Sequence, residues 1–159
     1  MPANSWKLAP GLNNVGSYQV SGTPFASGSI VAHASGSSGA TVVRFPAVTK
    51  WVMIQPHHGM LHHRTLRVAF SKNGLHGKGA SNPAGGYNFH VNISSSTIGP
   101  LDMRVSELWF MSDDASTYTF DIVAGLTGIQ IGSLYTSDRA VNGTVQAAGP
   151  NWSGSVGVG

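Results

Sequence analysis

The stretch Thr117-Tyr-Thr-Phe-Asp-Ile-Val123 alternates polar and apolar side chains with a period of two. This alternation is typical of a β-strand with one buried and one solvated face, because successive side chains of a strand point to opposite faces of the sheet. Its large apolar residues are Tyr118, Phe120 and Ile122. We therefore predict a half-buried strand that directs these three side chains into a core.

The same period recurs on the N-terminal side of this stretch. The predicted strands, with their inward residues, are Thr65–Lys72 (Leu66, Val68, Phe70) and Tyr87–Ile93 (Tyr87, Phe89, Val91, Ile93). Thr49–Gln55 is more uniformly apolar than these segments, which is typical of a central strand. Leu101–Met111 directs Leu101, Met103 and Val105 inward and then changes parity to Leu108 and Phe110, which we interpret as a β-bulge near Ser106–Glu107.

Turn-forming residues separate these segments, and patterns typical of helices are almost absent. The main turn signals are Pro46, Pro56, Asn73-Gly74, Asn82-Pro83, Gly99-Pro100 and Asp113-Asp114. Short strands at this spacing are typical of a sandwich. We predict an all-β protein with seven or eight strands in two packed antiparallel sheets.

Composition divides the chain into three zones. Residues 41–135 contain nearly all the aromatic residues and the periodic signal. Residues 1–40 and 136–159 are rich in small and polar residues, and only Ser29–His33 in the first of these zones has the pattern of a strand. We predict a Gly/Ser-rich N-terminal arm (1–40), a β-sandwich core (41–135) and an extended C-terminal arm (136–159).

The surface chemistry implied by the composition is unusual. Charged residues make up 9% of the chain, roughly a third of the usual share for a soluble domain. The chain is not typical of a disordered protein, because 41% of its residues are hydrophobic and its net charge is only +3. We expect much of its surface to be covered in a larger assembly.

Several classes of partner are not expected from this sequence. Its nine Lys and Arg residues are spread singly, whereas nucleic-acid binding is typical of clustered basic patches. No apolar run approaches the ~18 residues of a membrane span, and the N-terminus lacks the pattern of a signal peptide. We predict a soluble protein made in a cytoplasm that binds neither nucleic acid nor a membrane.

Catalysis is not expected either, and no cofactor is predicted. The chain has no cysteine and only six acidic residues, of which Asp113-Asp114 lies in a predicted turn. No Gly-x-Ser-x-Gly nucleophile motif precedes a helix. Gly74–Gly79 is the nearest match to a phosphate-binding loop, but it precedes neither a helix nor a Ser or Thr.

One segment is rich in imidazole groups. His57, His58, His62 and His63 lie in the stretch between two predicted strands, and imidazole binds zinc, copper or nickel. Neighbouring residues of a strand face opposite ways, so at most one of each pair can join a given site. The segment is either a polar loop or a site shared between subunits at a symmetry axis.

Two tryptophans lie in the predicted arms. Trp6 and Trp152 are surrounded by small residues with no core of their own, and a large aromatic side chain is costly to leave in water. Either each arm folds back on its own domain, or each tryptophan is an anchor that inserts into a neighbouring subunit.

A resemblance adds a more specific expectation. The segments that carry it are Val43–Val52, Leu66–Gly74, Tyr87–Phe89, Leu101–Phe110 and Ala124–Ile129. They resemble the small virion structural proteins of marine and freshwater tailed bacteriophages, in which a Phe-Pro strand precedes a Leu-Arg-x-x-Phe-Ser-x-Asn-Gly strand and a later Leu-Thr-Gly-Ile segment. The resemblance covers roughly residues 41–132 and leaves the arms out.

The resemblance implies a jelly-roll-like sandwich on the exterior of a virion capsid. Proteins of this kind commonly act as trimeric cement or decoration that bridges major capsid protein subunits. The expected function is therefore capsid cement, with the major capsid protein and further copies of this chain as partners. The alternative is a tail or fibre protein that recognises host glycans as a lectin does, for which Tyr87, Asn88, His90 and Asn92 could supply polar and aromatic groups.

Overall fold

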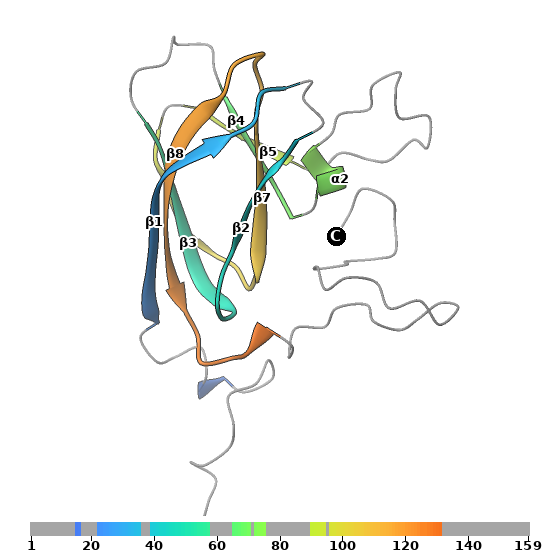
Figure 1. Ribbon diagram of the computed structural model, residues 1–159. Coiled ribbons are helices and arrows are strands. Elements are labelled where there is room, and N and C mark those ends of the chain that lie inside the picture. The colour runs from blue at the N-terminus through green and yellow to red at the C-terminus, as the bar shows by residue number, and fades with distance from the viewer. Residues whose placement is uncertain are drawn as a thin grey trace, which may run out of the picture.

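The computed structural model describes residues 15–16, 22–35, 39–57, 65–70, 72–75, 90–94 and 96–131. Its regular elements are β1 (Thr23–Ala32), β2 (Thr41–Arg44), β3 (Thr49–Pro56), β4 (Leu66–Ala69), α2 (Lys72–Leu75), β5 (His90–Ile93), β6 (Ile98–Asp102), β7 (Glu107–Ser112) and β8 (Tyr118–Leu126) (Figure 1). They form two four-stranded antiparallel sheets that pack as a sandwich. The predicted all-β sandwich is confirmed.

The strand order identifies the topology. Sheet A has the order β1-β8-β3-β6, and sheet B has the order β2-β7-β4-β5. The first strand pairs with the eighth, the second with the seventh, the third with the sixth and the fourth with the fifth, always antiparallel. This is one long antiparallel ribbon rolled up into two sheets, which is the jelly roll.

The core lies between the two sheets and contains the predicted apolar set of β8. Tyr118, Phe120 and Ile122 are at most 1% exposed, as their alternation predicts. Across the sandwich, the rings of Phe110 and Phe120 lie with their centroids 4.4 Å apart. This contact joins β7 of sheet B to β8 of sheet A. The inward residues of one strand thus pack against the inward residues of a strand in the other sheet.

The sandwich begins earlier in the chain than predicted. β1 pairs with β8 from Thr23 to Ala32, and the ring of Phe25 packs edge-on against Phe45 at 5.2 Å. The predicted strand Ser29–His33 was therefore too short, and β1 belongs to the sandwich although it lies within residues 1–40. A shift of register between Ser27 and Ile30 interrupts the alternation of β1, which hides the strand from a search for period two.

The segment Leu101–Met111 contains two strands and not one. β6 ends at Asp102 in sheet A and β7 begins at Glu107 in sheet B, so the chain crosses between sheets over residues 103–106. Val105, Leu108 and Phe110 are buried as predicted. The inferred β-bulge was wrong, because the parity changes where the chain leaves one sheet for the other.

Two predicted core residues of sheet B are exposed. Phe70 is 36% exposed because β4 ends at Ala69, and Val91 is 63% exposed because β5 is the edge strand of its sheet. Tyr87 and Phe89 lie outside the described residues. By contrast, the predicted outward residue Ala69 is buried in a second small cluster with Leu75 of α2 and Met111 of β7.

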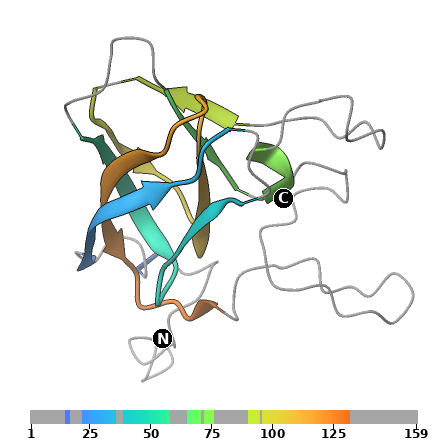
Figure 2. The ribbon, with the colours of Figure 1, turned by 45° about the horizontal axis from the view of Figure 1, so that its top comes forward.

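The two ends of the sandwich differ. We call the end at which β8 begins the loop pole and the end at which it finishes the terminal pole. β1, β3, β5 and β7 end at the loop pole, which is at the top of Figure 1 and comes forward in Figure 2. The described chain enters β1 and leaves β8 at the terminal pole, because Thr23 is the strand partner of Leu126.

Candidate functional site

The face of sheet A that points away from the core is formed by rows of cross-strand partners. These rows are Pro24, Gly125, Trp51 and Asp102; Ala26, Val123 and Met53; Asp121 and Gln55; and Val31 and Thr119. We call this surface the outer face of sheet A. Its rows contain only two charged side chains, and Val31 and Val123 are 51% and 38% exposed.

Trp51 covers part of this face without a side chain beneath it. A Cβ atom at Gly125 would lie 2.7 Å from Cε2 of Trp51, so the indole packs directly on the backbone of β8. The ring remains half-buried. Gly125 therefore allows the large indole of Trp51 to lie directly on the sheet.

Asp121 is the centre of the polar contacts on the outer face of sheet A. Its Oδ1 lies 2.6 Å from Nε2 of His57 and accepts the backbone N–H of Ser29 at 2.8 Å. The backbone N–H of His57 donates to the carbonyl oxygen of Thr119 at 3.0 Å. One carboxylate of β8 thus links the two strands that flank it, because it contacts Ser29 within β1 and His57 directly after the end of β3.

The backbone of β1 is adapted to this contact. Ser29 has a positive φ of 56°, in the left-handed region that side chains other than glycine seldom adopt. It lies in the register shift of β1, where an extra residue turns its N–H toward Asp121. The N–H of Ser29 and then the imidazole of His57 hold the pKa of Asp121 below its ordinary value.

The predicted histidine site is only partly described. His57 contacts Asp121, whereas His58, His62 and His63 lie outside the described residues. Within the part of the chain that the structure describes, no group of three or more His, Cys, Asp or Glu side chains is close enough to hold a metal ion. The metal site at a symmetry axis therefore stays a prediction.

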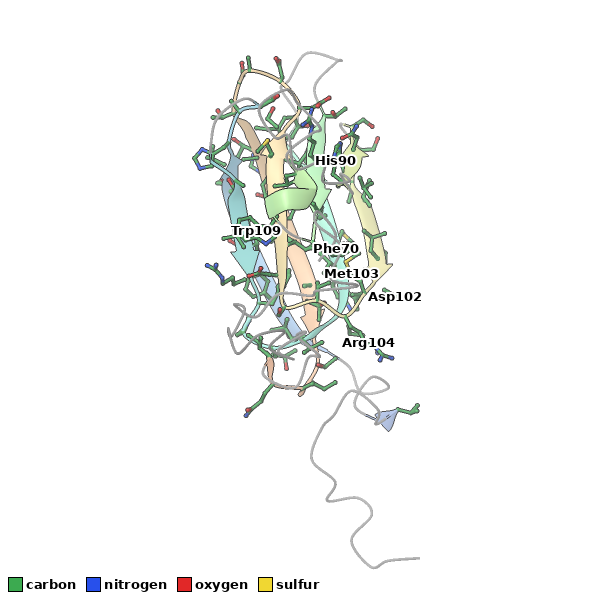
Figure 3. The ribbon with its side chains drawn as sticks, turned by 90° about the vertical axis from the view of Figure 1, so that its right-hand side faces the viewer. Phe70, His90, Asp102, Met103, Arg104 and Trp109 are labelled. Carbon is green, nitrogen blue, oxygen red and sulfur yellow. The ribbon has the colours of Figure 1, made fainter. Side chains whose placement is uncertain are left out.

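The predicted aromatic anchors, Trp6 and Trp152, also lie outside the described residues. Besides Trp51 on sheet A, the structure describes Trp109, which lies on sheet B beside α2 (Figure 3). Its Nε1 donates to Oε1 of Glu107 at 2.9 Å, and Oε2 of Glu107 accepts Arg44 at 3.3 Å. Glu107 thus has both its carboxylate oxygens in contacts with neighbouring side chains, and we assign these contacts to the stability of sheet B and not to ligand binding.

Of the four residues considered for glycan recognition, the structure describes two. His90 and Asn92 lie on β5, and Nδ1 of His90 is 3.3 Å from the carbonyl oxygen of Gly74 in α2. Asn92 is exposed. Tyr87 and Asn88 are beyond the described residues. The described part of this set contains no aromatic side chain on which a sugar ring could stack.

Sequence reasoning did not single out Val31, Val123, Met53 or Asp121. A signal was present for three of them, because Val123 and Met53 are apolar at outward positions of their strands and Asp121 is the one acid in an apolar strand. Val31 had no such signal, since the register shift in β1 obscures which way it points.

The comparisons add no functional assignment to this geometry. Among the described residues, no helix has the length and apolar character needed to cross a membrane. No protein-family model matches the sequence, and no significant similarity to a curated protein or to a solved structure was found.

Proposed function

We propose that this chain is a cement or decoration protein on the exterior of a tailed-bacteriophage capsid, where it stabilises the head by bridging major capsid protein subunits. The observation that carries the proposal is the outer face of sheet A, with its exposed valines and two charged side chains. We further propose that copies of the chain associate as a homotrimer through this face.

The physics of protein interfaces supports this assignment of the face. The centres of interfaces are depleted of charged residues, and exposed apolar side chains on a face with few charges are typical of contact sites. The 9% charge of the whole chain extends the same argument beyond one sheet. A protein that is repeated many times over a shell also needs little affinity per contact, because many weak contacts act together.

The fold is compatible with the proposal and does not by itself select it. Jelly rolls occur in viral capsid proteins and in lectins, and one fold serves many functions. The resemblance of residues 41–132 to small virion proteins favours the first of these classes. The resemblance rests on strand and turn residues, so the decisive test is the place and number of copies of the chain in a particle.

The test is quantification of the chain in purified particles against the major capsid protein. We expect hundreds of copies per particle, released together when heads are stripped of their exterior proteins. A few copies that co-purify with tails would support the glycan-binding alternative. Absence of the chain from particles would overturn both assignments.

A further inference from the structure

The chain enters the sandwich and leaves it at the same pole, the terminal pole. Thr23 is the cross-strand partner of Leu126, and a Cβ atom at Gly22 would lie 2.9 Å from Cα of Gly125. The described chain therefore enters β1 and leaves β8 on neighbouring strands, at the terminal pole, and the sequence has 21 further residues before Gly22 and 28 further residues after Ile131.

The terminal pole is tightly connected by hydrogen bonds from two buried threonines. Oγ1 of Thr49 donates to the carbonyl oxygen of Met103 at 2.7 Å and accepts the N–H of Val105 at 3.0 Å. Oγ1 of Thr127 donates to the carbonyl oxygen of Val48 at 2.8 Å. The β2–β3 connection, the β6–β7 connection and the chain after β8 are thereby held together.

Further backbone bonds complete this platform. The N–H of Val48 donates to the carbonyl oxygen of Ile129 at 3.0 Å, and that of Phe45 donates to Ser106 at 2.8 Å. Ile129 is fully buried, so the chain is fixed three residues beyond the end of β8. Figure 3 shows Asp102, Met103 and Arg104 together at this end of the sandwich. A surface that is ordered before contact has less conformational entropy to lose on binding.

The geometry points to the terminal pole as the surface that docks on the shell, with the loop pole directed away from it. This inference rests on the proposed function and names the docking surface and its partner, a protein shell built of repeated subunits. A segment of 21 residues can reach at most about 70 Å from its attachment point. Attachment at the docked pole gives both segments their full reach over neighbouring subunits, whereas attachment at the far pole would use about 30 Å of it along the nine residues of β8.

The absence of cysteine from the sequence allows a direct test by labelling. Ala115→Cys places one thiol on an exposed residue of the loop pole, and Gln130→Cys places one on an exposed residue of the terminal pole. Pro46→Cys, also exposed and in the β2–β3 connection, is a second probe of the terminal pole. Each purified variant is labelled with a maleimide, first free and then bound to heads that were prepared without the chain.

We expect all three variants to react at similar rates when free. On heads, we expect Gln130→Cys and Pro46→Cys to react at least tenfold more slowly, while Ala115→Cys keeps its rate. Protection of Ala115→Cys with free reaction at the terminal pole would overturn the inference and leave the proposed function standing, and so would equal rates at both poles. Failure of every variant and of the unmodified chain to bind heads would overturn the proposed function and this inference with it.

Discussion

The contacts of the Asp121 side chain depend on its being ionised, so the stabilisation that they give is lost at low pH. Its carboxylate accepts the N–H of Ser29 and contacts His57, and these contacts hold its pKa below the ordinary value. A carboxyl group whose pKa is lower in the folded than in the unfolded chain stabilises the fold above the unfolded value, about 3.9, and this contribution disappears as the pH falls through the folded value.

We therefore expect Asp121→Asn to lower the free energy of unfolding at pH 7, and the difference from the unmodified chain to shrink as the pH is lowered below about 4. Urea unfolding at pH 7, 5 and 3 measures both proteins. The side chain of Asp121 is 36% exposed, so solvent screening keeps the effect small. A difference that stays constant from pH 7 to pH 3 would show that the ionised carboxylate is not what stabilises the three strands.

Ser29 has a backbone conformation that is unfavourable for serine. Its φ of 56° suits glycine, so Ser29→Gly should stabilise the fold by up to about 1 kcal/mol. Ser27→Gly is the matched control, because Ser27 lies in the regular part of the same strand, where glycine costs roughly 0.5–1 kcal/mol. Urea unfolding of both variants should give changes of opposite sign. Destabilisation of similar size in both would contradict this account of the register shift.

At the scale of elements, β3 and β8 are joined by the contact between Trp51 and Gly125. A Cβ atom at Gly125 would overlap the indole, so Gly125→Ala should cost about 1–3 kcal/mol, as other overpacked substitutions do. In a Trp51→Ala background the same change meets no ring and should cost much less. A double-mutant cycle measures this coupling from four unfolding curves. Equal costs of Gly125→Ala in both backgrounds would place the strain elsewhere.

The elements also show which parts of the fold can be predicted from sequence. β3 was predicted to within one residue and β8 except for its last three residues, because both strands lie in the middle of sheet A and their burial follows period two or a largely apolar run. β1 was largely missed because its small residues and register shift carry no clear alternation. Val91 was misplaced because alternation gives the face of a strand and does not reveal that the strand lies at an edge.

The candidate surface was less predictable than the fold for a related reason. Val123 and Met53 belong to one row only because β3 and β8 are neighbours, although about 70 residues separate them in the sequence. The contact of His57 with Asp121 depends on the same pairing. Single-strand patterns give neither the order of strands in a sheet nor their register, so sequence pointed to isolated histidines and tryptophans and not to a shared face.

At the scale of the whole molecule, self-association through the outer face of sheet A can be tested with buried charge. Val31→Asp with Val123→Asp would place two carboxylates in the proposed contact, where an unpaired charge is costly. We expect at least tenfold weaker self-association by sedimentation equilibrium. Val91→Asp is the control, because this valine is 63% exposed on sheet B and should leave association unchanged. Equal loss in both proteins, or a monomeric unmodified chain at every concentration, would refute the proposed homotrimer.

The terminal segments allow a test of bridging that leaves the sandwich whole. Deletion of residues 1–21 stops before Thr23, so it keeps all of β1 and the contact of Phe25 with Phe45, and deletion of residues 132–159 keeps the buried Ile129. We expect both truncated chains to unfold with midpoints close to that of the full chain, because neither deletion removes a described core residue. If these segments bridge neighbouring capsid subunits, heads assembled with the truncated chains should lose their DNA at a lower temperature than heads with the full chain. Heads of unchanged heat stability with both deletions present would mean that the sandwich alone, through the outer face of sheet A and the terminal pole, supplies whatever stabilisation the protein gives.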